Sequence, residues 1–105
     1  MTINDKIKEF TELLELHQLE QLKIDKLDCE GNRHNRKVTI VEGKKYVKVD
    51  IGNSGRYMIE LSTGNIYGIK AYGVIHRGHH FGTLDTIHAY YWGSYRAHKR
   101  EVENG

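Results

Sequence analysis

The chain has no proline and only one cysteine among its 105 residues. A single cysteine, Cys29, cannot form an internal disulfide, and it excludes a cysteine-rich zinc site. Its solitary presence favours a reducing compartment. The N-terminal "MTINDKIKEF" lacks the apolar segment of a signal peptide, and no apolar run is long enough to cross a bilayer. We therefore expect a cytoplasmic protein with no membrane partner.

Sequence signatures of common enzyme classes are also absent. The chain contains no HExxH, no GxSxG and no Walker loop. Hydrophobic residues make up 38% and charged residues 29%, which is the composition of a globular chain and not of a disordered one. A length of 105 residues fits one domain, and we expect residues 1–105 to form it.

The net charge is only +2, but the charge is unevenly distributed. Residues 1–30 hold four lysines against eight acidic residues, whereas residues 31–105 hold twelve basic against six acidic residues. Five of the seven histidines lie between residues 62 and 100. A basic half that also carries imidazoles indicates an anionic partner or a solvated basic face.

The hydrophobic pattern predicts an α+β fold. Apolar residues with helical spacing predict an N-terminal helix that ends near His17, and the polar residues 30–36 predict a loop. The segment "QLEQLKIDKL" between them fits either a continued helical face or a short strand. Alternating runs in "KVTIV", "KYVKVDI", "RYMIEL" and "NIYGIKAYG" are separated by the turn sequences "EGKK", "GNSG" and "STGN". We expect the helix to pack on an antiparallel β-meander of about four strands, followed by a Gly/His-rich loop and an aromatic C-terminal segment.

A run of histidine, arginine and glycine follows the predicted strands in "GVIHRGHHFGTLDT", residues 73–86. Metal ligation needs three or four side chains that converge on one ion, and an HxxH spacing aligns two histidines only on a helix. We therefore assign no metal ligand and no cofactor. The ligand-competent residues of this region are His76, His79, His80, Asp85 and His88.

Acid–base chemistry is a second hypothesis for the same region. A histidine beside Asp85 has the groups for catalysis near neutral pH, as in a histidine-dependent phosphodiesterase or a metal enzyme. The context "TLDT" suits an Asp85 side chain in a turn equally well. We name no catalytic residue, so whether the protein is an enzyme stays open, with binding favoured.

Anion binding without turnover accounts best for the mixture of residue types. Glycines let backbone N–H groups approach a phosphate closely, guanidinium groups and protonated imidazoles donate to its oxygens, and tyrosine rings stack on bases. A phosphorylated, nucleotide-like molecule uses all three. The expected ligand-binding residues are Lys70, Tyr72, His76, Arg77, His79, His80, Tyr91 and Arg96.

The aromatic C-terminal segment fits two further interpretations. Trp92 is expected in the core, as large aromatic residues usually are. The aromatic run 90–95 and the basic residues that follow it would alternatively form a contact surface for another protein or a nucleic acid.

Residues 45–86, "KYVKVDIGNSGRYMIELSTGNIYGIKAYGVIHRGHHFGTLDT", resemble small uncharacterised accessory proteins of tailed bacteriophages. In those proteins a strand pair leads through "TGxIYGIKxYG" into a loop that ends in "YGTLDT", and Phe81 stands here where tyrosine is frequent. The resemblance implies a phage protein made in the bacterial host cytoplasm. Small phage proteins of this kind often counter host defences, either by sequestering nucleotide signals or by binding a host effector.

These observations together lead to one functional prediction and two alternatives. We expect a phage counter-defence protein that binds and sequesters a phosphorylated, nucleotide-like signalling molecule without turnover. Because a small domain rarely encloses such a ligand alone, we expect a homo-oligomer with the site near a subunit boundary. The alternatives are an inhibitor that binds a host defence protein, for example of a CRISPR complex, or nucleic acid, and the histidine-dependent enzyme described above.

Overall fold

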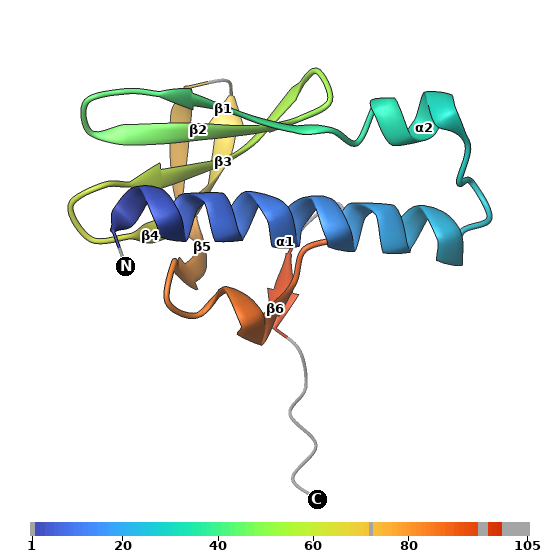
Figure 1. The fold of residues 1–105 in the computed structure, drawn as a ribbon. Helices are drawn as coiled ribbons and strands as arrows, with labels where there is room; N and C mark the ends of the chain where they lie inside the picture. The colour runs from blue at the N-terminus through green and yellow to red at the C-terminus, as the bar shows by residue number, and fades with distance from the viewer. Residues whose placement is uncertain (1, 72, 95–96, 100–105) are drawn as a thin grey trace, which may run out of the picture.

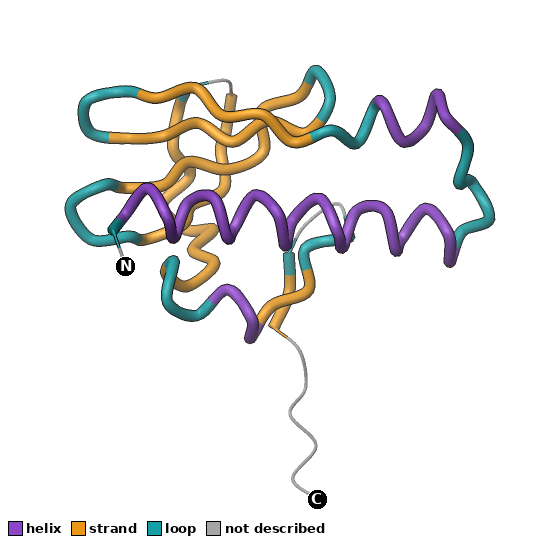
Figure 2. The backbone as a smooth tube through the Cα atoms, viewed as in Figure 1, coloured by secondary structure: helices purple, strands orange, loops and turns teal. Residues whose placement is uncertain are grey.

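The computed structural model describes residues 2–71, 73–94 and 97–99. An N-terminal helix packs on a five-stranded antiparallel sheet whose strand order follows the chain, which confirms the predicted α+β meander (Figure 1). The elements, coloured by type in Figure 2, are α1 (Ile3–Ile24), α2 (Glu30–His34), β1 (Val38–Glu42), β2 (Tyr46–Ile51), β3 (Ser54–Glu60), β4 (Asn65–Ala71), β5 (Val74–Thr83), the 3-10 helix η1 (Ile87–Ala89), β6 (Tyr90–Tyr91) and β7 (His98–Lys99). Among the described residues, no helix combines the length and apolarity needed to span a bilayer.

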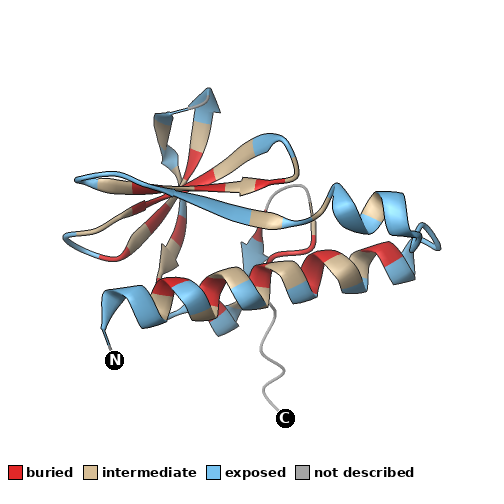
Figure 3. Ribbon diagram, turned by 45° about the horizontal axis from the view of Figure 1, so that its top comes forward, coloured by how far each residue is buried: buried red, intermediate tan, exposed pale blue. Residues whose placement is uncertain are grey.

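Helix α1 is longer than predicted. It continues to Ile24, so the predicted end near His17 is wrong. The buried positions of its middle turns are taken by the polar residues His17 and Gln18, which interrupt the apolar pattern without interrupting the helix. Leu22, one turn further on, is buried again. Figure 3 shows the resulting buried stripe along the side of α1 that faces the sheet.

Residues 30–36, predicted to be a loop, contain the short helix α2. None of its residues is buried. A helix of one turn with no buried residue leaves no apolar periodicity in the sequence, and this is why the pattern did not reveal it.

The predicted Gly/His-rich loop is also wrong, because most of it forms a fifth strand, β5, that pairs with β4. Gly73 makes the tight turn between the two strands with a φ of +79°, a conformation that favours glycine. The β4–β5 register shifts in three places. Glycines in β5 therefore mark bulges in a paired strand and not an unpaired loop.

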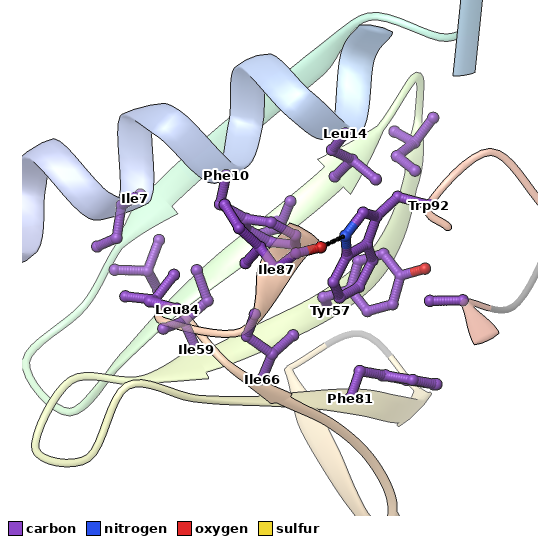
Figure 4. Packing of buried hydrophobic residues seen from close by; sticks show 14 residues of the cluster. Ile7, Phe10, Leu14, Tyr57, Ile59, Ile66, Phe81, Leu84, Ile87 and Trp92 are labelled. Carbon is purple, nitrogen blue, oxygen red and sulfur yellow. Dashed lines mark hydrogen bonds between the residues drawn. The ribbon is translucent and has the colours of Figure 1, made fainter. Parts of the chain in front are cut away.

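The core lies between α1 and one face of the sheet (Figure 4). Trp92 is fully buried, which confirms its predicted place in the core. Its ring packs edge-to-face on Phe10 of α1, at 4.7 Å between centroids, and on Tyr57 of β3, at 5.3 Å. Its indole N–H donates to the Ile87 carbonyl at 2.9 Å, so the one polar atom of the ring has a partner.

Candidate functional site

Strand β5 carries most of the predicted site residues, and its geometry decides where each one goes. His76 pairs with Gly68 of β4, and His80 pairs with Tyr67, the residue just before Gly68. Four positions of β5 thus span one position of β4, so residues 77–79 bulge out of the ladder. The bulge separates side chains that the sequence suggested would act together.

His76 and His79 remain together across the bulge. Their rings stack at 3.9 Å between centroids with an angle of 9° between the planes. The Nδ1 atom of His76 is buried and has no hydrogen-bond partner among the described residues. Of the two histidines, His79 lines the hollow described next.

A hollow of about 150 Å³ lies beside His79, where β3, β4 and β5 adjoin. We call it the Arg56–His79 hollow. It combines two cationic or titratable groups, two glycines and two aromatic side chains, which is the mixture predicted for a phosphate-binding site. Its lining residues are Gly55, Arg56, Tyr57, Gly68, Ile69, His79 and Phe81.

Gly68 makes room for two side chains of the wall of the hollow. A Cβ at this position would lie 3.0 Å from the His79 Cβ and 3.2 Å from Cε2 of Phe81. These distances are tighter than normal van der Waals contact, so a larger residue would push both side chains aside or fill the space. The absence of a side chain at Gly68 thus lets His79 and Phe81, two lining residues of the hollow, pack directly on the β4 backbone.

Tyr57 connects the hollow with the core. Its side chain is 3% exposed and packs at 5.4 Å between ring centroids against Phe81. Burial raises the pKa of Tyr57 to about 12, although the neighbouring Arg56 charge and the Ala97 backbone oppose the rise. The phenol is therefore neutral at physiological pH and contributes a polar but uncharged wall.

Arg77 and His80 do not line this hollow, and their side chains contact other residues of the sheet. Arg77 Nη2 donates to the Tyr46 hydroxyl at 3.3 Å, and its guanidinium carbon lies 5.6 Å from the centre of the Tyr67 ring. His80 Nε2 is 3.2 Å from Asn65 Oδ1, and its ring is 5.3 Å from that of Tyr67. Both side chains make contacts within the sheet, and neither lines the Arg56–His79 hollow.

Lys70 and Tyr91, two further predicted binding residues, do not line the hollow either. Lys70 is exposed near the end of β4. Tyr91 is held against α1, where its hydroxyl donates to Gln21 Oε1 at 2.6 Å and its ring lies 5.1 Å from that of His17. Tyr72 and Arg96 fall outside the described residues.

Asp85, considered as the carboxylate of a catalytic histidine–carboxylate pair, and the nearby His88 each form an ion pair with α1. Asp85 Oδ1 is 2.8 Å from Lys6 Nζ of α1, and His88 Nε2 is 2.9 Å from Glu9 Oε1, also of α1. Asp85 thus joins the 83–86 turn to the helix instead of orienting a histidine. Within the described part of the chain, no three His, Cys, Asp or Glu residues are grouped to hold a metal ion.

Sequence reasoning missed Arg56 and the two glycines of the hollow. A weak signal was present, since an isolated glycine within an alternating strand such as Gly68 indicates a bulge or a close backbone approach. Arg56 stands in a hairpin strand outside the histidine-rich segment. Only the pairing of β3 with β4, and of β4 with β5, brings it to His79.

Fold and site together define an α+β protein with a small cationic hollow at the margin of its sheet. Compared with protein-family models, with curated proteins and with solved structures, the chain gives no match.

Proposed function

We propose that this protein binds a phosphorylated, nucleotide-like molecule without turnover and holds one of its phosphate groups in the Arg56–His79 hollow. The observation that carries the proposal is the meeting of Arg56, His79 and Gly68 in one concavity. A guanidinium offers two parallel donors to phosphate oxygens, and a protonated imidazole adds a third. Glycine backbone lets the anion come close.

The size of the hollow limits what it takes. Its volume of about 150 Å³ is below the roughly 300 Å³ of pockets that enclose a whole small molecule. It suits a terminal phosphate or a similar end group, while the rest of the ligand lies outside. Of the predicted residues that the structure describes, His79 lines the hollow, and Lys70, His76, Arg77, His80 and Tyr91 do not.

Binding without reaction is supported by the composition of the lining. No aspartate or glutamate is among the described residues that form the wall of the hollow. Asp85, the carboxylate considered as an orienting group, is paired with Lys6. The described lining therefore supplies hydrogen-bond donors to an anion, and it includes no carboxylate that could act as a base.

The biological role that fits this chemistry is sequestration of a phosphorylated signalling nucleotide in the bacterial host. The resemblance to small tailed-phage proteins supplies this context, and the hollow supplies a place for the phosphate. A counter-defence protein of this kind acts in the cytoplasm, where such signals are made.

Calorimetry with phosphate-bearing ligands tests the proposal. The panel contains inorganic phosphate, ADP-ribose, and cyclic di- and trinucleotides. We expect at least one to bind, and Arg56→Gln to weaken that binding by about tenfold to a hundredfold, since hydrogen bonds to charged groups contribute about 1.5–3 kcal/mol. Gly68→Ala should weaken it as well by occupying the hollow.

Arg77→Gln is the matched control, because it removes the same charged group from a position that does not line the hollow. We expect it to retain binding within about threefold, as an effect of long-range charge alone is small at physiological salt. Absence of heat with every ligand, or equal losses for the two arginine variants, would count against the proposal.

A further inference from the structure

Strand β1 forms one margin of the sheet, because the strand order is β1-β2-β3-β4-β5 (Figure 1). Hydrogen bonds at the two ends of the β1–β2 pair show which residues of β1 bond to β2. The Gly43 N–H donates to the Tyr46 carbonyl at 3.0 Å, and the Gly52 N–H donates to the Lys37 carbonyl at 2.8 Å. Because antiparallel pairs alternate, odd-numbered residues of β1 bond to β2 and the even-numbered ones point their N–H and C=O groups outward.

The outward groups belong to Val38, Ile40 and Glu42. In the described part of the chain, no strand lies beyond them in the sheet. Exposed edges of this kind are templates for pairing with another strand, and proteins usually protect them with proline, lysine or bulges.

The two edge strands of the sheet differ in how they are protected against pairing with another strand. Strand β5, at the far margin, is protected by its bulged register against β4. Strand β1 pairs with β2 without any register shift and contains no proline, lysine or arginine. Two of its apolar side chains are well exposed, Ile40 at 38% and Val41 at 46%.

We infer that β1 pairs with β1 of a second copy of this chain, antiparallel and across a two-fold axis at Ile40. In that register Ile40 lies opposite its own symmetry mate, Val38 lies opposite Glu42, and Thr39 lies opposite Val41. The outward residues of the two strands coincide, so every outward N–H and C=O within β1 meets a partner. The two sheets become one continuous sheet.

The side chains of β1 support a second copy as the occupant. The opposed pairs at the centre, Ile40 with Ile40 and Thr39 with Val41, are β-branched, and no two like charges face each other between residues 38 and 42. Ile40 lies on the face that carries the core, since its cross-strand neighbours Val49 and Tyr57 are core residues. The two Ile40 side chains would cover each other at the symmetry axis, as an isologous interface requires.

This interface is independent of the ligand proposal. The Arg56–His79 hollow belongs to β3, β4 and β5, toward the other margin of the sheet. A dimer built on β1 thus carries two separate hollows. It differs from the expectation of a site at a subunit boundary.

A proline at position 40 tests the interface. Ile40→Pro removes an outward N–H and no bond to β2, and an edge strand tolerates proline where its N–H faces outward. We expect sedimentation velocity to show a dimer for the natural chain and a dissociation constant raised at least about tenfold for Ile40→Pro, the loss of about 1.4 kcal/mol or more. Ile40→Val is the matched control, because it keeps the N–H and most of the side chain, and it should remain dimeric.

Amide hydrogen exchange of the natural chain provides a second readout that needs no variant. In the dimer, the amides of Val38, Ile40 and Glu42 are as protected as those of Thr39 and Val41. In a monomer only the latter two are protected, because only they bond to β2. A natural chain that is monomeric at every concentration, or a dimer that Ile40→Pro leaves intact, overturns the inference.

Discussion

At the scale of single residues, Gly82 shows how one backbone conformation joins two elements. It has a φ of +72° near the end of β5. A Cβ at this position would collide with Thr86 Oγ1 and lie 2.9 Å from the Tyr90 ring. The Thr86 hydroxyl cannot move freely, since it accepts the Thr83 N–H at 2.9 Å.

We therefore predict that Gly82→Ala lowers the free energy of unfolding by about 1–3 kcal/mol, the cost of holding a residue with a side chain in a left-handed conformation. Urea denaturation followed by circular dichroism measures the change. Gly31→Ala serves as the control, because a Cβ at Gly31 in α2 would meet nothing within 4 Å. That variant should gain up to about 1 kcal/mol from helix propensity, and a loss of similar size in both variants would refute the explanation.

At the scale of elements, α1 holds the segment that follows η1 by two hydrogen bonds to the backbone of Trp92. The Trp92 N–H donates to His17 Nδ1 at 3.0 Å, and the Trp92 carbonyl accepts from Gln18 Nε2 at 2.6 Å. Gln18 Oε1 in turn accepts from Arg36 at 3.3 Å. Two consecutive polar residues of the helix thus satisfy both backbone groups of a fully buried residue.

Replacing Gln18 with methionine, which has a similar shape, should lower the free energy of unfolding by about 1–3 kcal/mol because the buried Trp92 carbonyl loses its donor. Chemical denaturation with tryptophan fluorescence is a suitable measurement, since Trp92 is the single tryptophan. Glu20→Ala, at an exposed position of the same helix, should change stability by less than about 0.5 kcal/mol. If the two variants unfold alike, the bond to Trp92 contributes nothing.

Elements with a strong apolar pattern could be predicted from the sequence, and those shaped by long-range polar contacts could not. Strands β2 and β4 alternate clearly between buried and half-buried positions, and the turns between strands carry glycines with positive φ, such as Gly52 and Gly64. The second half of α1 was missed because His17 and Gln18 look like surface residues until the Trp92 backbone is placed against them.

The types of residue in the candidate site could be predicted from the sequence, but the particular residues could not. A mixture of histidine, arginine, glycine and aromatic residues was expected, and such a mixture lines the Arg56–His79 hollow. Which residues contribute depends on the β5 bulge, which turns His79 toward Arg56 while Arg77 contacts Tyr46 and Tyr67. A single sequence does not reveal where a strand gains extra residues relative to its neighbour.

At the scale of the whole molecule, a cluster of aromatic rings joins helix, sheet and C-terminal segment. Tyr57 is central to it, with edge-to-face contacts to Phe10, Phe81 and Trp92. Such pairs contribute about 0.5–1.5 kcal/mol each beyond the area they bury. Because the phenol of Tyr57 is buried with them, the ionisation of one group affects the stability of the entire fold.

The stability of the protein should fall in strongly alkaline solution. The pKa of Tyr57 rises from 10.0 to about 12 on folding, so the folded chain favours the neutral phenol. The stabilisation is complete below the unfolded-state pKa and is lost as the pH rises through about 12, with a total of about 2–3 kcal/mol for a shift of this size.

Denaturation at a series of pH values between 9 and 12 measures this loss. Tyr57→Phe keeps the ring and removes the ionisable group, so its stability should decline less over the same interval. Parallel curves for the two proteins would show that other groups cause the alkaline loss.

The contact between Gln18 and Trp92 joins residues that are 74 positions apart in the chain. Before Trp92 packs against α1, the side chains of Phe10 and Leu14 are partly uncovered. Closing a loop of this length costs conformational entropy, and this cost precedes the formation of the core. During translation the N-terminal helix leaves the ribosome before Trp92 does, and its apolar side stays exposed during that interval. Mutations that delay this final closure should therefore appear first as aggregation during synthesis, before any effect on the finished fold.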